Sequence, residues 1–178
     1  YKTKESNFNI FNECNYLMVK SILYQLDKKN ALSKFEIEFL NNYFWHCEFL
    51  GHYELSLYGN TLYSLKSASI YLLSQEVIKK TSVLNHKNLN SRDYIRAVLN
   101  SILELIDRKE FQKSLELLSL MEKYISEMYF FEKYTCVFCK NIVLWNLNQD
   151  ESIKRKCLDQ LEFLKTILDS NYYTFFAD

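Results

Sequence analysis

One stretch decides the fold predicted for this chain: Phe44-Trp45-His46-Cys47-Glu48-Phe49-Leu50-Gly51-His52-Tyr53-Glu54-Leu55-Ser56-Leu57-Tyr58-Gly59-Asn60. Apolar residues recur at helical spacing on both sides of Gly51. We expect Gly51 to end the first helix in a left-handed conformation, which glycine adopts without steric strain. Gly59 falls inside the second helix, where glycine costs about 1 kcal/mol relative to alanine. Such a glycine usually admits a neighbouring backbone, so the stretch predicts a helical hairpin tightly packed at Gly59.

The same hairpin repeats along the chain. A capping box at Ser33 and Glu36 starts a helix, because each side chain can bond the other residue's backbone amide. Further hairpins begin near residues 67, 110 and 150, so the starts are 34, 43 and 40 residues apart. This spacing is typical of tetratricopeptide or HEAT-like solenoids. We therefore predict a single all-α domain over residues 1–178, a degenerate tetratricopeptide-like superhelix of about eight to nine helices with a concave inner surface.

Composition narrows the class of protein. The 178 residues include no proline and two glycines, which favours long helices joined by short turns. The 22 basic and 22 acidic residues cancel, so the chain has no net charge to attract DNA. No apolar run is long enough to span a membrane, and the five cysteines suggest a reducing compartment. We expect a cytoplasmic protein with no cofactor.

No catalytic or metal-binding set is visible. Cys136 and Cys139 have the spacing of a metal-binding pair but lie in an apolar helical run without a second pair, so core thiols are the simpler interpretation. His46 and His52 flank the hairpin turn without a nucleophile or a third ligand nearby. We predict that the chain is not an enzyme.

A stripe of polar residues marks a candidate binding surface. Arg92, Arg96 and Asn100 follow one another at four-residue spacing on a helix that begins at Ser91. One interpretation is a solvated face held by side-chain pairs. The other is the floor of a groove, where an arginine binds a peptide carboxylate and Asn100 bonds a peptide group.

Two further amides and one phenol belong to the same hypothesis. Asn60 and Asn141 stand in helices among apolar neighbours, against the usual preference of asparagine for caps and turns. Tyr63 lies close to Asn60 and is either a ligand contact or a half-buried core residue. The candidate peptide-binding residues are therefore Asn60, Tyr63, Arg92, Arg96, Asn100 and Asn141.

The C-terminal end is unusually apolar. It either covers the last repeat as a cap or forms a subunit interface, and we favour a homodimer interface. The residues assigned to this interface are Leu164, Leu168, Tyr172, Tyr173, Phe175 and Phe176.

Several segments resemble the C-terminal domain of Rgg/GadR/MutR-type transcriptional regulators. The matching segments are residues 35–44, the Gly51-His52-Tyr53-Glu54-Leu55 run with Leu57-Tyr58-Gly59-Asn60, and Ile70 to Glu76, together with Met18 to Leu23 and Phe131 to Tyr134. The resemblance implies a repeat domain that dimerises and binds a short peptide pheromone in its concave groove. It also implies that DNA is bound only through a helix-turn-helix domain, which we expect to be missing from this chain.

A rival interpretation needs no such domain. A helical-repeat adaptor would bind segments of other proteins and have no DNA-binding partner domain.

Overall fold

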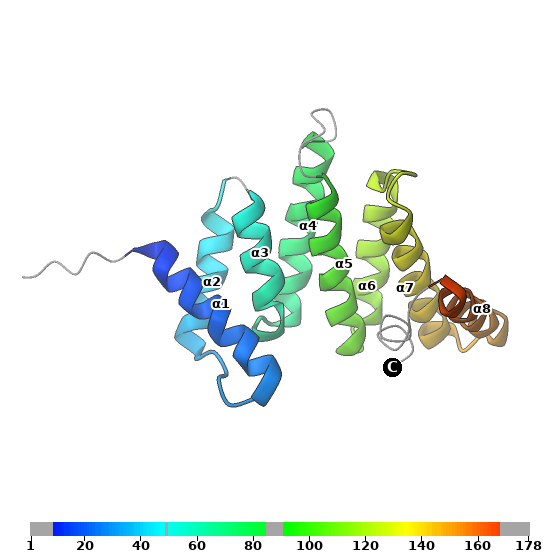
Figure 1. Ribbon diagram of the computed structural model, residues 1–178, viewed down its shortest axis with the longest axis horizontal. Helices are drawn as coiled ribbons and strands as arrows, with labels where there is room; N and C mark the ends of the chain where they lie inside the picture. Colours follow the sequence, from blue (N-terminus) through cyan, green and yellow to red (C-terminus); the bar gives the residue numbers. More distant parts are fainter. Residues whose placement is uncertain (1–8, 49, 85–90, 168–178) are drawn as a thin grey trace, which may run out of the picture.

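The computed structural model describes residues 9–48, 50–84 and 91–167, without the side chains of residues 80–84, 91 and 167. These residues form eight α-helices and two short 3-10 helices (Figure 1). In chain order they are α1 (Ile10–Asp27), α2 (Lys34–His46), α3 (His52–Thr61), η1 (Leu62–Ser64), α4 (Ser67–Leu84), α5 (Ser91–Asp107), α6 (Phe111–Met121), η2 (Glu122–Tyr124), α7 (Phe130–Asn148) and α8 (Glu151–Ile167). The predicted all-α fold is confirmed for this part of the chain.

The helices stack in two layers (Figure 1). In one layer α1 packs on α3, α3 on α5 and α5 on α7, while α2, α4 and α6 form the other. The odd-numbered helices contact one another more extensively than the even-numbered ones do, and α2 contacts α4 only weakly. The odd-numbered helices therefore form the more closely packed of the two layers.

A continuous core runs between the layers. Its centre is the buried phenol of Tyr58 on α3, which donates to the Ile70 carbonyl at 3.1 Å and lies 3.1 Å from the Ser74 hydroxyl on α4. Ser101 of α5 donates to the same phenolic oxygen at 3.0 Å. Burial raises the Tyr58 pKa to about 12. The Tyr58 hydroxyl therefore has the hydrogen-bond partners that a buried polar group requires, and its bonds join α3 to α4 and α5.

Helix ends follow the sequence signals closely. The capping box is present: Glu36 N–H donates to Ser33 Oγ at 3.3 Å and Ser33 N–H to Glu36 Oε2 at 2.6 Å. The predicted hairpin starts near 33, 67, 110 and 150 agree with helices that begin at 34, 67, 111 and 151. Ser67 is the first residue of α4.

Both expectations about glycine are wrong. Gly51 has φ −79° and precedes α3, where its N–H donates to Glu54 Oε2 at 2.9 Å. The left-handed turns fall instead on Lys28, Lys109 and Gln149. At Gly59 an added Cβ would have no heavy atom outside its own helix within 4 Å, so this glycine does not admit a neighbouring backbone. Gly59 instead borders an open space between α3 and α5.

Candidate functional site

A pocket of ≈ 210 Å³ opens between α3 and α5 on the odd-numbered layer. It is lined by His52, Leu55, Ser56, Gly59, Asn60, Asp93, Arg96, Ala97 and Asn100. Three predicted residues, Asn60, Arg96 and Asn100, thus come together from two helices. The absent side chain of Gly59 leaves part of this space open. The pocket combines amides, a guanidinium and a small apolar floor.

Arg96 is held by a carboxylate that the sequence interpretation did not include. Glu132 of α7 accepts from Arg96 Nε at 2.8 Å and from Arg92 Nε at 2.7 Å through the same oxygen, Oε1. Arg92 Nη2 is 3.4 Å from the second oxygen, Oε2. The Glu132 side chain is 1% exposed, whereas the side chains of Arg92 and Arg96 are 49% and 53% exposed. A buried carboxylate therefore serves two half-exposed arginines.

The electrostatics agree with this pairing. Burial opposes ionisation of Glu132, yet the hydrogen bonds from Arg92 and Arg96 outweigh it and lower the pKa of this carboxyl. The same bond raises the pKa of Arg92. Arg92 also lies over the Tyr129 ring, 5.8 Å from its centroid. The hydrogen bonds from Arg92 and Arg96 to Glu132 hold the start of α5 against the start of α7.

The polar side chains of the pocket differ in whether they already have a hydrogen-bond partner within the protein. Asn60 Nδ2 donates to the Ser56 carbonyl of its own helix at 2.8 Å. Asn100 is exposed, and no hydrogen bond of its side chain occurs among the described residues. At the other rim His52 Nδ1 is 3.3 Å from Asp93 Oδ2. Asn100 and the outer edge of Arg96 are thus the groups best placed to meet a ligand.

Three predicted contacts lie elsewhere. Arg92 shares Glu132 with Arg96 but does not line the pocket. Tyr63 lies in η1 with a half-exposed ring, and its carbonyl accepts from Arg108 Nη2 at 3.2 Å. Asn141 Nδ2 donates to Gln160 Oε1 at 2.8 Å, which joins α7 to α8. Asn141 is not among the residues that line the pocket, and its amide is already bonded to Gln160.

The predicted dimer interface is mostly outside the described residues. Leu168, Tyr172, Tyr173, Phe175 and Phe176 all fall there. Leu164 is described and is 2% exposed in the single chain, so its side chain has no free surface to offer a partner. Dimerisation stays a prediction.

The paired cysteines of α7 are core residues in the structure. Cys136 and Cys139 are buried thiols, and burial raises the pKa of each to about 12. Thiols held in the neutral form are poor nucleophiles and poor metal ligands. Within the described ranges no group of three His, Cys, Asp or Glu side chains could hold a metal ion.

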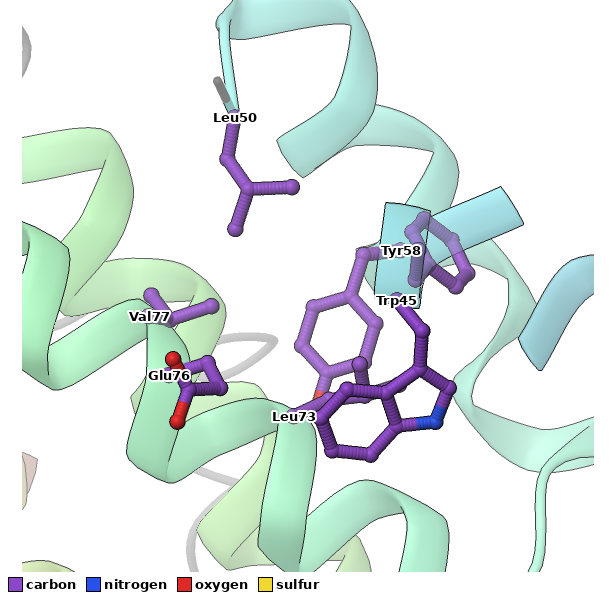
Figure 2. Close-up of a pocket in the computed structure, with 7 residues that line it drawn as sticks. Trp45, Leu50, Tyr58, Leu73, Glu76 and Val77 are labelled. Atoms are coloured by element: carbon purple, nitrogen blue, oxygen red, sulfur yellow. The ribbon is translucent and has the colours of Figure 1, made fainter. Parts of the chain in front are cut away.

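Two other pockets open on the even-numbered layer. Figure 2 shows the smaller, of ≈ 110 Å³, where Trp45, Leu50, Leu73 and Val77 surround an apolar space with Glu76 at its edge. A wider one of ≈ 600 Å³ lies between α4 and α6. On its wall Tyr71 donates to Glu116 Oε2 at 2.5 Å and Gln112 to Glu116 Oε1 at 3.3 Å. Four of its polar side chains, those of Tyr71, Gln75, Gln112 and Glu116, are joined by hydrogen bonds.

A signal for Glu132 was present in the sequence. It stands beside the aromatic residues Phe130, Phe131 and Tyr134 at the start of a helix, and an ionised side chain that such neighbours bury needs a partner. Arg92 and Arg96 are two cations one turn apart, which likewise need a counter-charge. Pairing them required the distance between α5 and α7, which periodicity does not provide.

The fold and the pocket together define a class: an all-α helical-repeat domain with a polar pocket on the odd-numbered layer. None of the described helices is long and apolar enough to cross a membrane. The family model of the HTH-type transcriptional regulator Rgg, C-terminal domain, matches residues 1–177, and the chain belongs to this family.

A solved structure has the same fold. The chain is similar to the X-ray crystal structure of the Streptococcus dysgalactiae SHP pheromone receptor Rgg2, with a TM-score of 0.78 and 20% sequence identity. The similarity covers 94% of this chain and 62% of that chain. The chain thus spans less than two thirds of the Rgg2 chain.

Proposed function

We propose that this chain is the ligand-sensing and dimerisation domain of a cytoplasmic transcriptional regulator, and that its ligand is a short peptide. The observation that carries the proposal is the α3–α5 pocket, where Asn60, Arg96 and Asn100 converge. Amide side chains can both donate to and accept from a peptide backbone. A guanidinium adds a charge-assisted bond to a carboxylate.

Membership of the Rgg C-terminal domain family supports the regulatory part of the proposal. The similarity to a pheromone receptor supports the peptide as the class of ligand. In this proposal the domain has no catalytic role, and DNA is bound only by a helix-turn-helix domain. The peptide acts by favouring one arrangement of the repeats over another, which shifts the population of the regulator.

An adaptor function is the second candidate. The wide pocket between α4 and α6 favours it, because Leu115 and Leu120 provide apolar surface beside the Tyr71–Glu116 bond. An extended segment of another protein could lie there without involving the α3–α5 pocket. The two candidates therefore differ in the layer that binds.

Binding experiments separate them. A library of short synthetic peptides is screened by fluorescence polarisation, and hits are measured by calorimetry. In the sensing proposal Arg96→Ala weakens binding roughly tenfold or more, since a hydrogen bond to a charged group contributes roughly 1.5–3 kcal/mol. Asn100→Ala weakens it several-fold, since a bond between neutral groups contributes about 0.5–1.5 kcal/mol. The matched control Gln112→Ala, in the other pocket, leaves the affinity unchanged. The reverse pattern would favour the adaptor, and unchanged affinity in all three variants would reject both sites.

A further inference from the structure

We infer that Arg92, Arg96 and Glu132 form an anion site that receives a carboxylate of the ligand; this inference rests on the proposed function and specifies its ligand. The three side chains meet at one oxygen, with Nε–Oε1 distances of 2.7 Å and 2.8 Å. Two cations and one anion leave the cluster itself with one net positive charge. Of the three side chains, Arg96 lines the pocket that contains Asn60 and Asn100.

The geometry favours a planar anion. Glu132 binds Arg96 through Nε, and this is the one bond of the Arg96 guanidinium within the part of the chain that the structure describes. The Nη1 and Nη2 donors stay available as a fork, which matches the two oxygens of a carboxylate. Because Glu132 already fixes the guanidinium, less side-chain freedom is lost when a ligand binds.

Other charges facing the site set limits on its strength. Asp93 lines the same pocket and opposes an anion, although His52 lies 3.3 Å from its carboxylate. Glu132 opposes the anion as well, since the ligand must share a guanidinium with it. Affinity for an anion should therefore follow the charge of the Arg92–Arg96–Glu132 cluster. Removing either arginine lowers this charge to zero, and neutralising Glu132 raises it to two.

Acetate and acetamide test the inference directly. The two probes have nearly the same shape, and acetate alone carries a charge. Side-chain Nε–H signals of Arg92 and Arg96 are followed by NMR during each titration, with ionic strength held constant by chloride. We expect acetate to shift both signals and acetamide to shift neither. In Arg96→Gln the shift of Arg92 should require at least about tenfold more acetate, which is the loss of one charge-assisted bond.

Glu132→Gln provides a result that a purely structural role would not produce. Acetate should bind this variant several-fold more tightly, even though the variant is less stable. If it does not fold, Asp93→Asn replaces it, since this change also removes an opposing charge and should also tighten acetate binding. Equal shifts by acetate and acetamide, or weaker acetate binding in a folded Glu132→Gln or Asp93→Asn variant, would overturn the inference.

Three small probes then locate the carboxylate on a ligand. N-acetyl-dileucine has a free terminal carboxylate, its C-terminal amide has none, and N-acetyl-aspartyl-leucinamide has a side-chain carboxylate. The inference expects one or both charged probes to shift the Arg96 signal and the amide not to. Peptides from the library that bind with no preference for a carboxylate would refute the anion site but leave the peptide-sensing proposal intact.

Discussion

At the start of α5, Arg92 and Arg96 share one buried carboxylate and are about half exposed, whereas Arg108 at its end is 24% exposed and has its donors occupied. Arg108 Nε donates to Glu104 at 2.7 Å, and Nη1 to the Leu65 carbonyl at 2.6 Å. Its Nη2 donates to the Tyr63 carbonyl at 3.2 Å. These carbonyls belong to the end of η1 and the connection to α4, which helical bonds leave unpaired.

The difference separates two uses of the same residue type on one helix. Arg108 satisfies the Leu65 carbonyl, which is partly buried, and also bonds the more exposed Tyr63 carbonyl. Arg96 satisfies one carboxylate and keeps its outer donors available beside a pocket. Changes at the end of α5 should therefore reduce stability, and single changes at its start should mainly reduce binding.

The largest effect is expected when both arginines at the start of α5 are removed. Arg92→Ala combined with Arg96→Ala leaves Glu132 buried without a partner, and an unpaired buried charge costs about 3–5 kcal/mol. Urea unfolding monitored by circular dichroism measures the loss. Either single variant should lose far less, because one arginine still pairs with Glu132.

A triple variant is the control for that result. Adding Glu132→Gln to the two arginine changes removes the stranded charge and should recover a large part of the stability. A double variant as stable as the single ones would show that Glu132 does not depend on the arginines, and the contrast between the two ends of α5 would fail.

Arg108→Ala should have the next largest effect. It leaves the partly buried Leu65 carbonyl without its donor, and an unsatisfied buried polar group costs about 1–3 kcal/mol. Thermal unfolding measures the change. Arg155→Ala on exposed α8 is the matched control and should stay within about 0.5 kcal/mol of the parent. A similarly small loss for Arg108→Ala would show that Arg108 contributes no more to stability than an exposed arginine does.

Acid should weaken the start of α5 selectively. The folded-state pKa of Glu132 lies below its ordinary value, so its contribution is complete above the unfolded pKa of about 4.3. The contribution is lost as the pH falls through the lower, folded pKa. Stability measured by urea unfolding from neutral to acid pH should therefore fall more for the parent than for Glu132→Gln. Parallel curves for the two proteins would contradict the pairing of Glu132 with the arginines.

Much of this architecture followed from local sequence rules. The Ser33–Glu36 capping box and the spacing of the hairpins depend on residues close in sequence, and both are confirmed. Family membership, expected from the segments around Gly51 and Ile70, is also confirmed. The glycine assignments failed because Gly51 precedes α3 with a negative φ and no neighbouring backbone approaches Gly59. The left-handed conformations at helix ends are adopted by Lys28, Lys109 and Gln149 instead.

The site was predictable only in part, for a geometric reason. Asn60, Arg96 and Asn100 share a pocket because α3 and α5 are neighbours in one layer, as the repeat predicts. Glu132 is 36 residues from Arg96, and Asn141 bonds Gln160 of the next helix. Such partners depend on the rotation of each helix about its axis, which a degenerate repeat does not determine.

The smallest effect expected is a gain in stability at Gly59, on the pocket wall that faces Arg96. Gly59→Ala adds a methyl group where no heavy atom outside its own helix lies within 4 Å, and it removes a helix-interior glycine. The variant should be more stable by about 1 kcal/mol, with a correspondingly higher melting temperature. Ala97→Gly, on the α5 wall of the same pocket, is the reverse change and should be less stable by at least about 1 kcal/mol. A Gly59→Ala variant that loses stability would show that the space beside Gly59 is already filled, which would contradict an open pocket between α3 and α5.

If the ligand lies in the space beside Gly59, the added methyl group should also weaken peptide binding. The contacts of Arg108 at the other end of α5 should stay unchanged.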